Sequence, residues 1–411
     1  MVRSRTAVRL VAALGWYWWL RSMKIEGAEL IAEAVDVPGV AQTADIEQLA
    51  VAYAMGALLA ADTPRADRAR EWFQLAVDLA GRIPDPDNPV LRLIGPVGAL
   101  GGFGSELGSA RPEIFDEAVD DPHPWVRTIA RILRAHTALN LGRLHAQAEA
   151  DFLAVTRMSD VTGDRWSRAV ALDGLASLEG RRGEHAAAAD HYRQAAELAA
   201  GLGTAEDEMH FRCFLARELW LIGERDQART ELIQAQSGAE RLGLPHVLAL
   251  AACTAGDLAR LDGDREAARN ALTRAEGLAA EPGGVPQIRA LIATALGYLA
   301  GAEGHLDAAR RWHAKALDIA RASADSPVIA QALIGLADLA LREGDPERAA
   351  ELLGASFAIR GTTDRSVPDE ERVAGQARSV LGGARYGEVY QRGQRVTIDA
   401  LPALIPLTPG A

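Results

Sequence analysis

The sequence is poor in residues that several common functions require. It has two cysteines, Cys213 and Cys253, so neither a disulfide framework nor a CxxC metal pair can be drawn. Aromatic residues make up 5% of the chain and long β-branched runs are missing, which favours helix over sheet. Lys24 and Lys315 are the only lysines, so arginine carries nearly all of the positive charge.

Motifs for nucleotide or metal chemistry are missing as well. The sequence contains no Gly-Lys-Ser/Thr of a phosphate-binding loop, no HExxH and no His-Cys cluster. The glycine-rich stretch from Gly98 to Gly104 lacks a strand-Gly-helix context and is interpreted as a loose stretch between helices. A net charge of −12 disfavours non-specific binding to the phosphates of nucleic acids. We therefore expect no catalytic residues, metal, cofactor or direct nucleic-acid binding.

The N-terminus has the outline of a targeting segment. Arg3, Arg5 and Arg9 precede an apolar run from Val11 to Leu20. That run is about half of the roughly 20 residues that a membrane span needs, and no small-x-small cleavage site follows it. We interpret it as the first helix of a repeat and expect no membrane association. The low cysteine content fits a reducing cytoplasm.

Internal periodicity is the strongest positive signal. A chain of 411 residues with 49% hydrophobic content is too long for one compact core, so either two domains or a stacked array is expected. Short turns recur around glycines that are 40 or 41 residues apart. These glycines are Gly142, Gly183, Gly223, Gly263, Gly304 and Gly344.

Small residues form further columns in the same register. Alanine recurs five and twelve residues after the turn glycines, and alanine or glycine recurs seven residues before them. The segments on both sides, such as 165–179 and 185–199, carry apolar residues at helical spacing. Two helices in a tight antiparallel pair need small residues where they approach most closely. The column before the glycines contains Ala135, Ala176, Ala216, Gly256, Gly297 and Ala337.

This pattern resembles the tetratricopeptide repeat, with HEAT-type repeats, whose period is nearer 40, as the structural rival. We predict an all-α, right-handed α-solenoid of about nine tetratricopeptide-like helix-turn-helix repeats of about 40 residues over residues 1–364. The repeats are more degenerate before about residue 125, where turns are expected near Ser22 and Pro64. Residues 365–411 break the period and are expected to form a capping segment with a helix at 368–381 and a proline-rich end.

The repeat register also predicts a binding groove. In such a solenoid the first helices of the repeats line the concave face, and we expect an exposed column there. Arg and Trp are favoured anchors in interfaces, so Arg217 and Trp220 beside Asp257 and Arg260 could hold a peptide or an acidic group. The alternative is an ordinary solvated face. The predicted groove residues are His136, Asp173, Ser177, His210, Arg217, Trp220, Asp257, Arg260, Thr294, Tyr298 and Asp338.

Three further aromatic residues stand apart from this groove. Trp16, Trp18 and Trp19 form a cluster in the first expected helix. An end helix without a neighbour could use them to dock a preceding domain or a partner. Cys213 and Cys253 occupy one site in neighbouring repeats, roughly a helix diameter apart, and are expected to be packing residues.

Both ends of the chain resemble a known family. The opening, Arg9 to Arg21 with Glu26 and Gly27, resembles the first repeat of large actinobacterial regulators of the AfsR/SARP type and of related LuxR-type ATPases. The end resembles their C-terminal signature through Ala349 to Ala355, Arg360, Pro368, Arg372, Leu381, Gly382, Tyr386, Tyr390, Gly393 and Thr397. The resemblance implies a repeat array that is joined to a DNA-binding domain and a switch NTPase domain, senses a protein or small effector, and restrains the switch.

The resemblance covers only the C-terminal third or so of that family. Because this chain has no winged helix and no P-loop, DNA binding and ATP hydrolysis are not carried over to it. The chain is then either a separate sensor module or the end of a longer gene whose start lies before Met1.

We expect a non-catalytic sensor module of a transcriptional regulator. Its partner would be a protein, a peptide or an effector, with the switch NTPase or DNA-binding domain in cis or in trans. The alternative is a free-standing scaffold unrelated to transcription. Self-association through the terminal helices is a further expectation.

Overall fold

The computed structural model describes residues 2–61, 63, 65–99, 111–280 and 285–401, and all regular secondary structure within them is helical. This confirms the all-α prediction for the described part of the chain. The packing of Cα atoms divides the chain into two compact units. Unit 1 comprises Met1–Thr137, Asp151–Ala171 and Leu198–Glu206, and unit 2 comprises Ala138–Ala150, Leu172–Glu197 and Asp207–Ala411.

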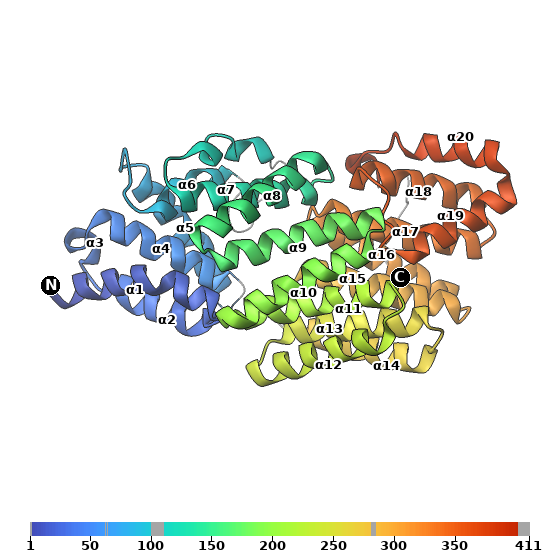
Figure 1. Ribbon diagram of the computed structural model, residues 1–411, viewed down its shortest axis with the longest axis horizontal. Coiled ribbons are helices and arrows are strands. Elements are labelled where there is room, and N and C mark those ends of the chain that lie inside the picture. Colours follow the sequence, from blue (N-terminus) through green and yellow to red (C-terminus); the bar gives the residue numbers. More distant parts are fainter. Residues whose placement is uncertain (1, 62, 64, 100–110, 281–284, 402–411) are drawn as a thin grey trace. The chain divides into compact units, whose positions relative to one another are not determined.

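The first part of the chain contains helices of 4 to 19 residues and some irregular structure (Figure 1). The turn expected near Ser22 separates the first two helices, and Ser22 itself has a positive φ of 55°. The glycine-rich stretch lies largely outside the described residues. The helices are α1 Val2–Leu20, α2 Lys24–Val35, α3 Val40–Thr43, α4 Ile46–Ala60, α5 Ala66–Ala80 and α6 Pro89–Ala99, followed by the 3-10 turns Pro112–Phe115 and Ala118–Asp120.

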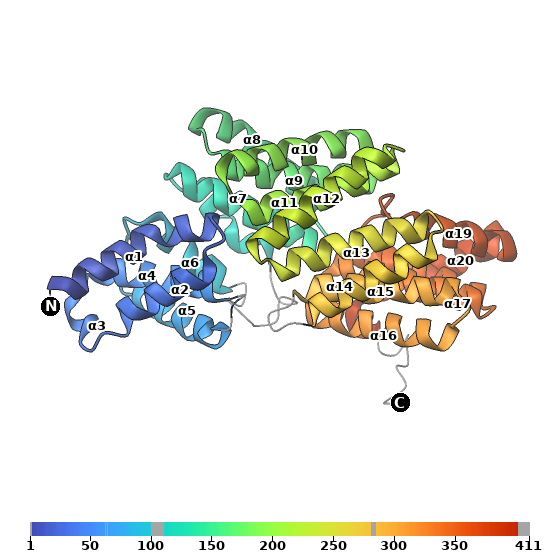
Figure 2. The same cartoon turned by 90° about the horizontal axis from the view of Figure 1, so that it is seen from below.

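From residue 124 onward the chain alternates regularly between helix and short turn, as Figure 2 shows for α13 to α17. Helices α7 to α11 each contribute residues to both units. The helices are α7 Pro124–Asn140, α8 His145–Thr162, α9 Arg165–Arg182, α10 His185–Leu202, α11 Ala205–Leu221, α12 Arg225–Leu242, α13 Pro245–Leu261, α14 Arg265–Ala279, α15 Pro286–Ala302, α16 Leu306–Ala322, α17 Ser326–Arg342, α18 Pro346–Arg360, α19 Pro368–Leu381 and α20 Gly383–Gly393.

The recurring glycines end the first helix of each pair, as predicted. All six have positive φ angles, from 66° at Gly142 to 90° at Gly223. At Gly223 the amide donates to the carbonyl of Trp220 and so closes the last turn of α11. Residues other than glycine pay a steric penalty in this region, which explains why the column is invariant within the chain.

A second column of turns lies between the pairs. Gly163, Gly203 and Gly243 follow one another at intervals of 40 residues and all have positive φ. Ala324 has a φ of 51° after α16, although it carries a side chain. The predicted repeat pattern does not include this column, although its period is the same.

The small-residue columns lie where the helices of a pair approach each other. A Cβ atom added at Gly297 would lie 2.4 Å from Cε1 of His313, and one at Gly256 would lie 2.7 Å from Cγ of Leu272. The alanines of the other columns are buried, except for half-buried Ala154. The predicted packing role of these residues is therefore confirmed.

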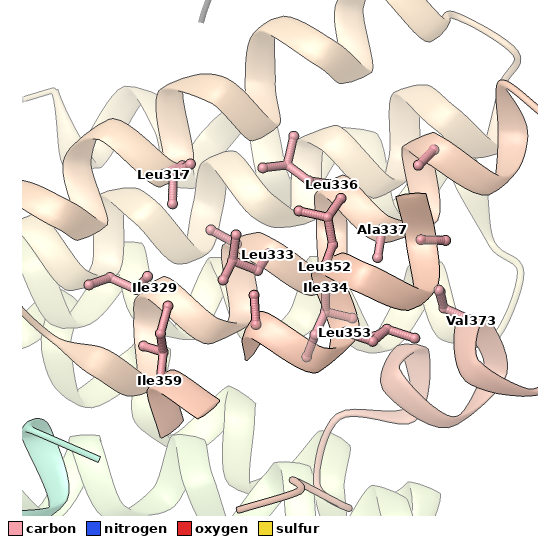
Figure 3. Packing of buried hydrophobic residues seen from close by; sticks show 14 of the residues in the cluster. Leu317, Ile329, Leu333, Ile334, Leu336, Ala337, Leu352, Leu353, Ile359 and Val373 are labelled. Atoms are coloured by element: carbon pink, nitrogen blue, oxygen red, sulfur yellow. The ribbon is translucent and has the colours of Figure 1, made fainter. Parts of the chain in front are cut away.

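Unit 2 continues past the repeats without a break in its core. Leu333, Leu352 and Leu353 pack together, and Val373 of α19 joins them (Figure 3). The helix predicted at 368–381 is α19, and α20 follows it beside α18 (Figure 1). At Gly393 an added Cβ would lie 2.0 Å from the carbonyl oxygen of Glu351, which shows how closely α20 approaches α18. The proline-rich end lies outside the described residues.

Candidate binding groove

Four of the predicted groove residues line one pocket in unit 2. Arg217 of α11, Asp257 of α13, and Thr294 and Tyr298 of α15 surround a cavity of about 50 Å³. These positions belong to the first helices of three successive pairs, which is why one register brings their side chains to one face. Gln331 of α17 also lines the pocket, although the sequence analysis did not name it.

The walls of the pocket are mostly apolar. Phe214, Leu250 and Leu291 contribute to them, together with both cysteines. Cys213 and Cys253 are buried free thiols, as expected for packing residues. Burial raises the pKa of the Cys213 thiol to about 12, so this thiol stays protonated at neutral pH and is a poor nucleophile.

Arg217 is the cation of the pocket. Its Nη2 donates to the backbone carbonyl of Ser366 at 2.7 Å. It forms no ion pair with any carboxylate in the part of the chain that the structure describes, and it is half-buried. A half-buried guanidinium without a carboxylate partner retains donors for an external acceptor.

Arg260 is neutralised within the protein. It pairs with Asp257 at 2.8 Å and with Asp369 at 2.6 Å, and its side chain is 10% exposed. Its guanidinium also lies over the ring of Tyr298, 4.6 Å from the centroid. Arg260 lowers the pKa of Asp369 against the opposing effect of burial. This side chain therefore holds the structure together and is not available to a ligand.

The predicted groove residues of α15 and α17 are buried, contrary to the expectation of an exposed column. Thr294, Tyr298 and Asp338 are 2%, 3% and 2% exposed. Asp338 pairs with Arg342 and Arg372, each at less than 3 Å. At Asp338 the expectation of exposure was wrong because Arg372, which lies outside the repeat register, pairs with its carboxylate.

The covering segment consists of residues 361–372, which we call the crossing segment. It leaves α18, contacts residues near the C-terminal ends of α9, α11, α13 and α17, and enters α19. The amide of Arg365 donates to the carbonyl of Arg181 at 3.0 Å in α9, and Ser366 and Asp369 meet Arg217 and Arg260 as described above. These contacts could not be predicted from the sequence, because a segment that breaks the period has no repeat register that would fix its position.

Arg360 anchors the start of the crossing segment. Its side chain is fully buried and pairs with Glu370 at 2.8 Å. It lies 3.8 Å from Asp364, whose carboxylate also accepts hydrogen bonds from the backbone and hydroxyl groups of Ser366. Burial raises the pKa of Asp364, but the opposing effects of Arg360, Arg181, Ser366 and Arg217 outweigh it, and the net shift is downward.

Other predicted groove residues have individual roles. Asp173 is half-buried and forms no ion pair in the described residues, and burial together with the Asp207 charge raises its pKa to about 7. His210 packs edge-on against Phe214, with ring centroids 4.8 Å apart. Trp220 donates to Asp262 at 3.1 Å.

Two further groove predictions differ in their outcome. Ser177 is half-buried in α9, and nothing in the structure tests its role. His136 belongs to unit 1, where its ring packs against Phe152 and burial lowers its pKa to about 4.

The tryptophans of α1 are engaged within unit 1. Trp16 and Trp19 stack at 4.9 Å, and both meet Trp166 of α9 edge to face. Trp125 of α7 completes the group against Trp16, and Trp18 is 6% exposed. Nothing tests the docking role predicted for Trp16, Trp18 and Trp19, but their rings already have neighbours.

Among the described residues, no group of three or more His, Cys, Asp or Glu side chains is arranged to hold a metal ion. None of the described helices combines the length and apolar character required to cross a bilayer.

Residues 289–361 match the tetratricopeptide-repeat family. This match decides between the two repeat types for that stretch, in favour of the tetratricopeptide repeat over HEAT. No curated protein matches the chain.

Solved structures extend the likeness in fold. A Rap protein complexed with competence and sporulation factor is 13% identical, with a TM-score of 0.56, and the match covers 97% of each chain. A STAND protein with a tetratricopeptide repeat sensor from Pyrococcus horikoshii is 12% identical, with a TM-score of 0.47. That match covers 83% of this chain and 52% of the other. At these identities the first likeness shows a shared helical-repeat fold.

Proposed function

We propose that this chain is a non-catalytic sensor module whose unit 2 groove binds a protein, peptide or effector and so controls a transcriptional regulator. The observation that carries the proposal is Arg217, a half-buried cation on the pocket wall without a carboxylate partner among the described residues. Partner binding through an array of helix pairs is what the repeat architecture favours, because the array presents one long face.

Two further observations support a binding role. The pocket thiols are buried, and Arg260 is fully paired, so the groove offers no activated nucleophile or base. The Rap protein with this fold was solved in complex with competence and sporulation factor, so that protein carries a bound factor.

The regulatory context rests on the resemblance at the two ends of the chain. It gives a switch NTPase, or an NTPase joined to a DNA-binding domain, as the partner, in cis or in trans. We place the module in the cytoplasm, where free thiols persist.

The test is affinity capture from the source cells after chemical cross-linking, with Arg217→Glu as the variant. Arg229→Glu is the matched control, because Arg229 is 71% exposed on α12 and pairs only with its neighbour Asp226 within the described chain. We expect a protein with NTPase motifs to be captured by the wild type and the control and lost with Arg217→Glu.

The other outcomes of this experiment distinguish between the proposed functions. Equal capture by all three chains contradicts the groove assignment. Loss with Arg217→Glu of a partner that has no NTPase motif favours the free-standing scaffold over the regulator.

A further inference from the structure

Arg217 contacts both the pocket and the crossing segment. Its side chain lines the pocket between α11, α13 and α15, and the same guanidinium holds the crossing segment through the Ser366 carbonyl. That carbonyl is the only hydrogen-bond acceptor recorded for it in the described residues, and a guanidinium has five N–H donors. Any acceptor that enters the pocket therefore meets the group that fixes the crossing segment.

The charges around the pocket favour a ligand that carries one negative charge. The carboxylate of Asp257 is paired with Arg260, which Asp369 neutralises further. Arg217 is left as the cation on the wall that forms no ion pair among the described residues, although its charge also acts on Asp364. A dianion such as phosphate would meet one cation and the nearby Asp257 carboxylate, whereas a monoanionic carboxylate matches one guanidinium in charge and in planar geometry.

The other walls of the pocket indicate the size and polarity of the rest of the ligand. Phe214, Leu250 and Leu291 are apolar, and the cavity of about 50 Å³ takes a short side chain or its equivalent. Tyr298 offers a polar atom, since its phenol oxygen is buried without a hydrogen-bond partner in the described structure. A buried polar atom without a partner is unfavourable, so a ligand that supplies an acceptor gains by satisfying it.

We propose that this pocket binds the carboxylate of a short apolar acid at Arg217, and that the bound carboxylate displaces the Ser366 carbonyl and loosens the crossing segment. The inference rests on the proposed function, in that it names the ligand class and the response of the same groove. A carboxylate is a stronger acceptor for a guanidinium than a neutral amide carbonyl. Loosening is confined to residues 362–366, because Val367 and Asp369 are buried on the next turn.

The experiment is hydrogen–deuterium exchange of the full chain with 3-methylbutanoate, and with 3-methylbutanamide as the uncharged control. With the acid we expect slower exchange in the peptides that contain Arg217 and Asp257, and faster exchange at residues 362–366. The amide should change neither.

Variants separate a ligand contact from a structural effect. Arg217→Gln should weaken binding of the acid roughly 10- to 100-fold, and Tyr298→Phe about 2- to 10-fold. Tyr298→Phe keeps the ring and the Arg217 bond to Ser366, so it tests the site even if Arg217→Gln disturbs folding. Arg229→Gln should bind as the wild type does.

The source of the carboxylate is distinguished by a second probe. An acetylated tetrapeptide that ends in leucine is compared with its C-terminal amide. Tighter binding of the free-acid peptide than of 3-methylbutanoate assigns the site to a peptide terminus, and the reverse order assigns it to a small acid.

Either order supports the site. Failure of both acids to change exchange, or equal effects of acid and amide, overturns the inference. The proposed function would then still stand if the Arg217-dependent partner were captured.

Discussion

His313 of α16 is expected to make unit 2 acid-sensitive. Its imidazole is 1% exposed and lies against Gly297 of α15 and Gly335 of α17. Neither ring nitrogen has a hydrogen-bond partner among the described residues. Burial lowers its pKa from 6.5 to about 4, with Asp338 and Asp369 opposing the shift and Arg260 and Arg342 reinforcing it.

The sign and size follow from linkage. A histidine whose pKa is lower in the folded state stabilises the fold above its unfolded pKa and loses that contribution as the pH falls toward its folded pKa. A shift from 6.5 to about 4 corresponds to about 3 kcal/mol, lost between these two pH values. About 2 kcal/mol of this should be gone at about pH 5.

The perturbation is His313→Met, which fills a similar volume and does not titrate. Urea unfolding of the wild type and the variant is compared at about pH 7.5 and about pH 5, so that every other titrating group cancels in the difference. The wild type should lose about 2 kcal/mol more than the variant over this interval. His305→Met, at a side chain that is 69% exposed, is the control and should behave as the wild type does.

Equal acid sensitivity of the wild type and His313→Met would refute the reasoning, because the imidazole would then bind a proton as readily in the fold as in the unfolded chain. Direct observation of the His313 ring by NMR gives an independent check, with protonation expected well below the usual range.

Four further variants probe the account. Asp173→Asn should raise the free energy of unfolding above pH 7 by up to about 4 kcal/mol and change it little below the ordinary aspartate pKa, because the raised pKa of Asp173 shows that its charged form is disfavoured in the fold. Unfolding measured at several pH values checks this. Ala324→Gly should stabilise by about 0.5–1 kcal/mol in thermal unfolding by relieving its positive φ, whereas a loss would contradict the strain. Gly335→Ala should cost about 1–3 kcal/mol, since the new Cβ would lie 2.4 Å from the His313 ring, and unchanged urea unfolding would refute that contact. Asp369→Ala should lower the free energy of unfolding by about 3 kcal/mol, near the low end for a broken buried pair, because Arg260 still pairs with Asp257. Tryptic cleavage after Arg365 should also become faster.

The parts that could be predicted from sequence are those that repeat. A turn glycine every 40 or 41 residues gave the ends of the first helices, because only glycine takes a positive φ without strain. The same register located Arg217, Asp257 and Tyr298, whose side chains line one pocket. Periodicity carries this information because each repeat places its residues relative to the next in the same way.

The parts that could not be predicted are set by a segment without a repeat. The charged residues Arg260 and Asp338 were predicted to lie on a polar, exposed face. Asp369 and Arg372 of the crossing segment instead pair with them and cover them. Contacts between residues more than a hundred positions apart, such as Arg260 with Asp369, leave no local pattern. Trp16 shows the same limit, since its partners Trp125 and Trp166 come from other helices.

The central claim is that the unit 2 groove is where the partner binds. It is tested most directly by placing a photo-cross-linking amino acid at Gln331, on the pocket wall, and at Ile233, which is 55% exposed on α12. After illumination in the source cells, the account predicts an adduct from position 331 that disappears with Arg217→Glu, and none from position 233. Adducts of equal yield from both positions, or an adduct from 331 that survives Arg217→Glu, would contradict it.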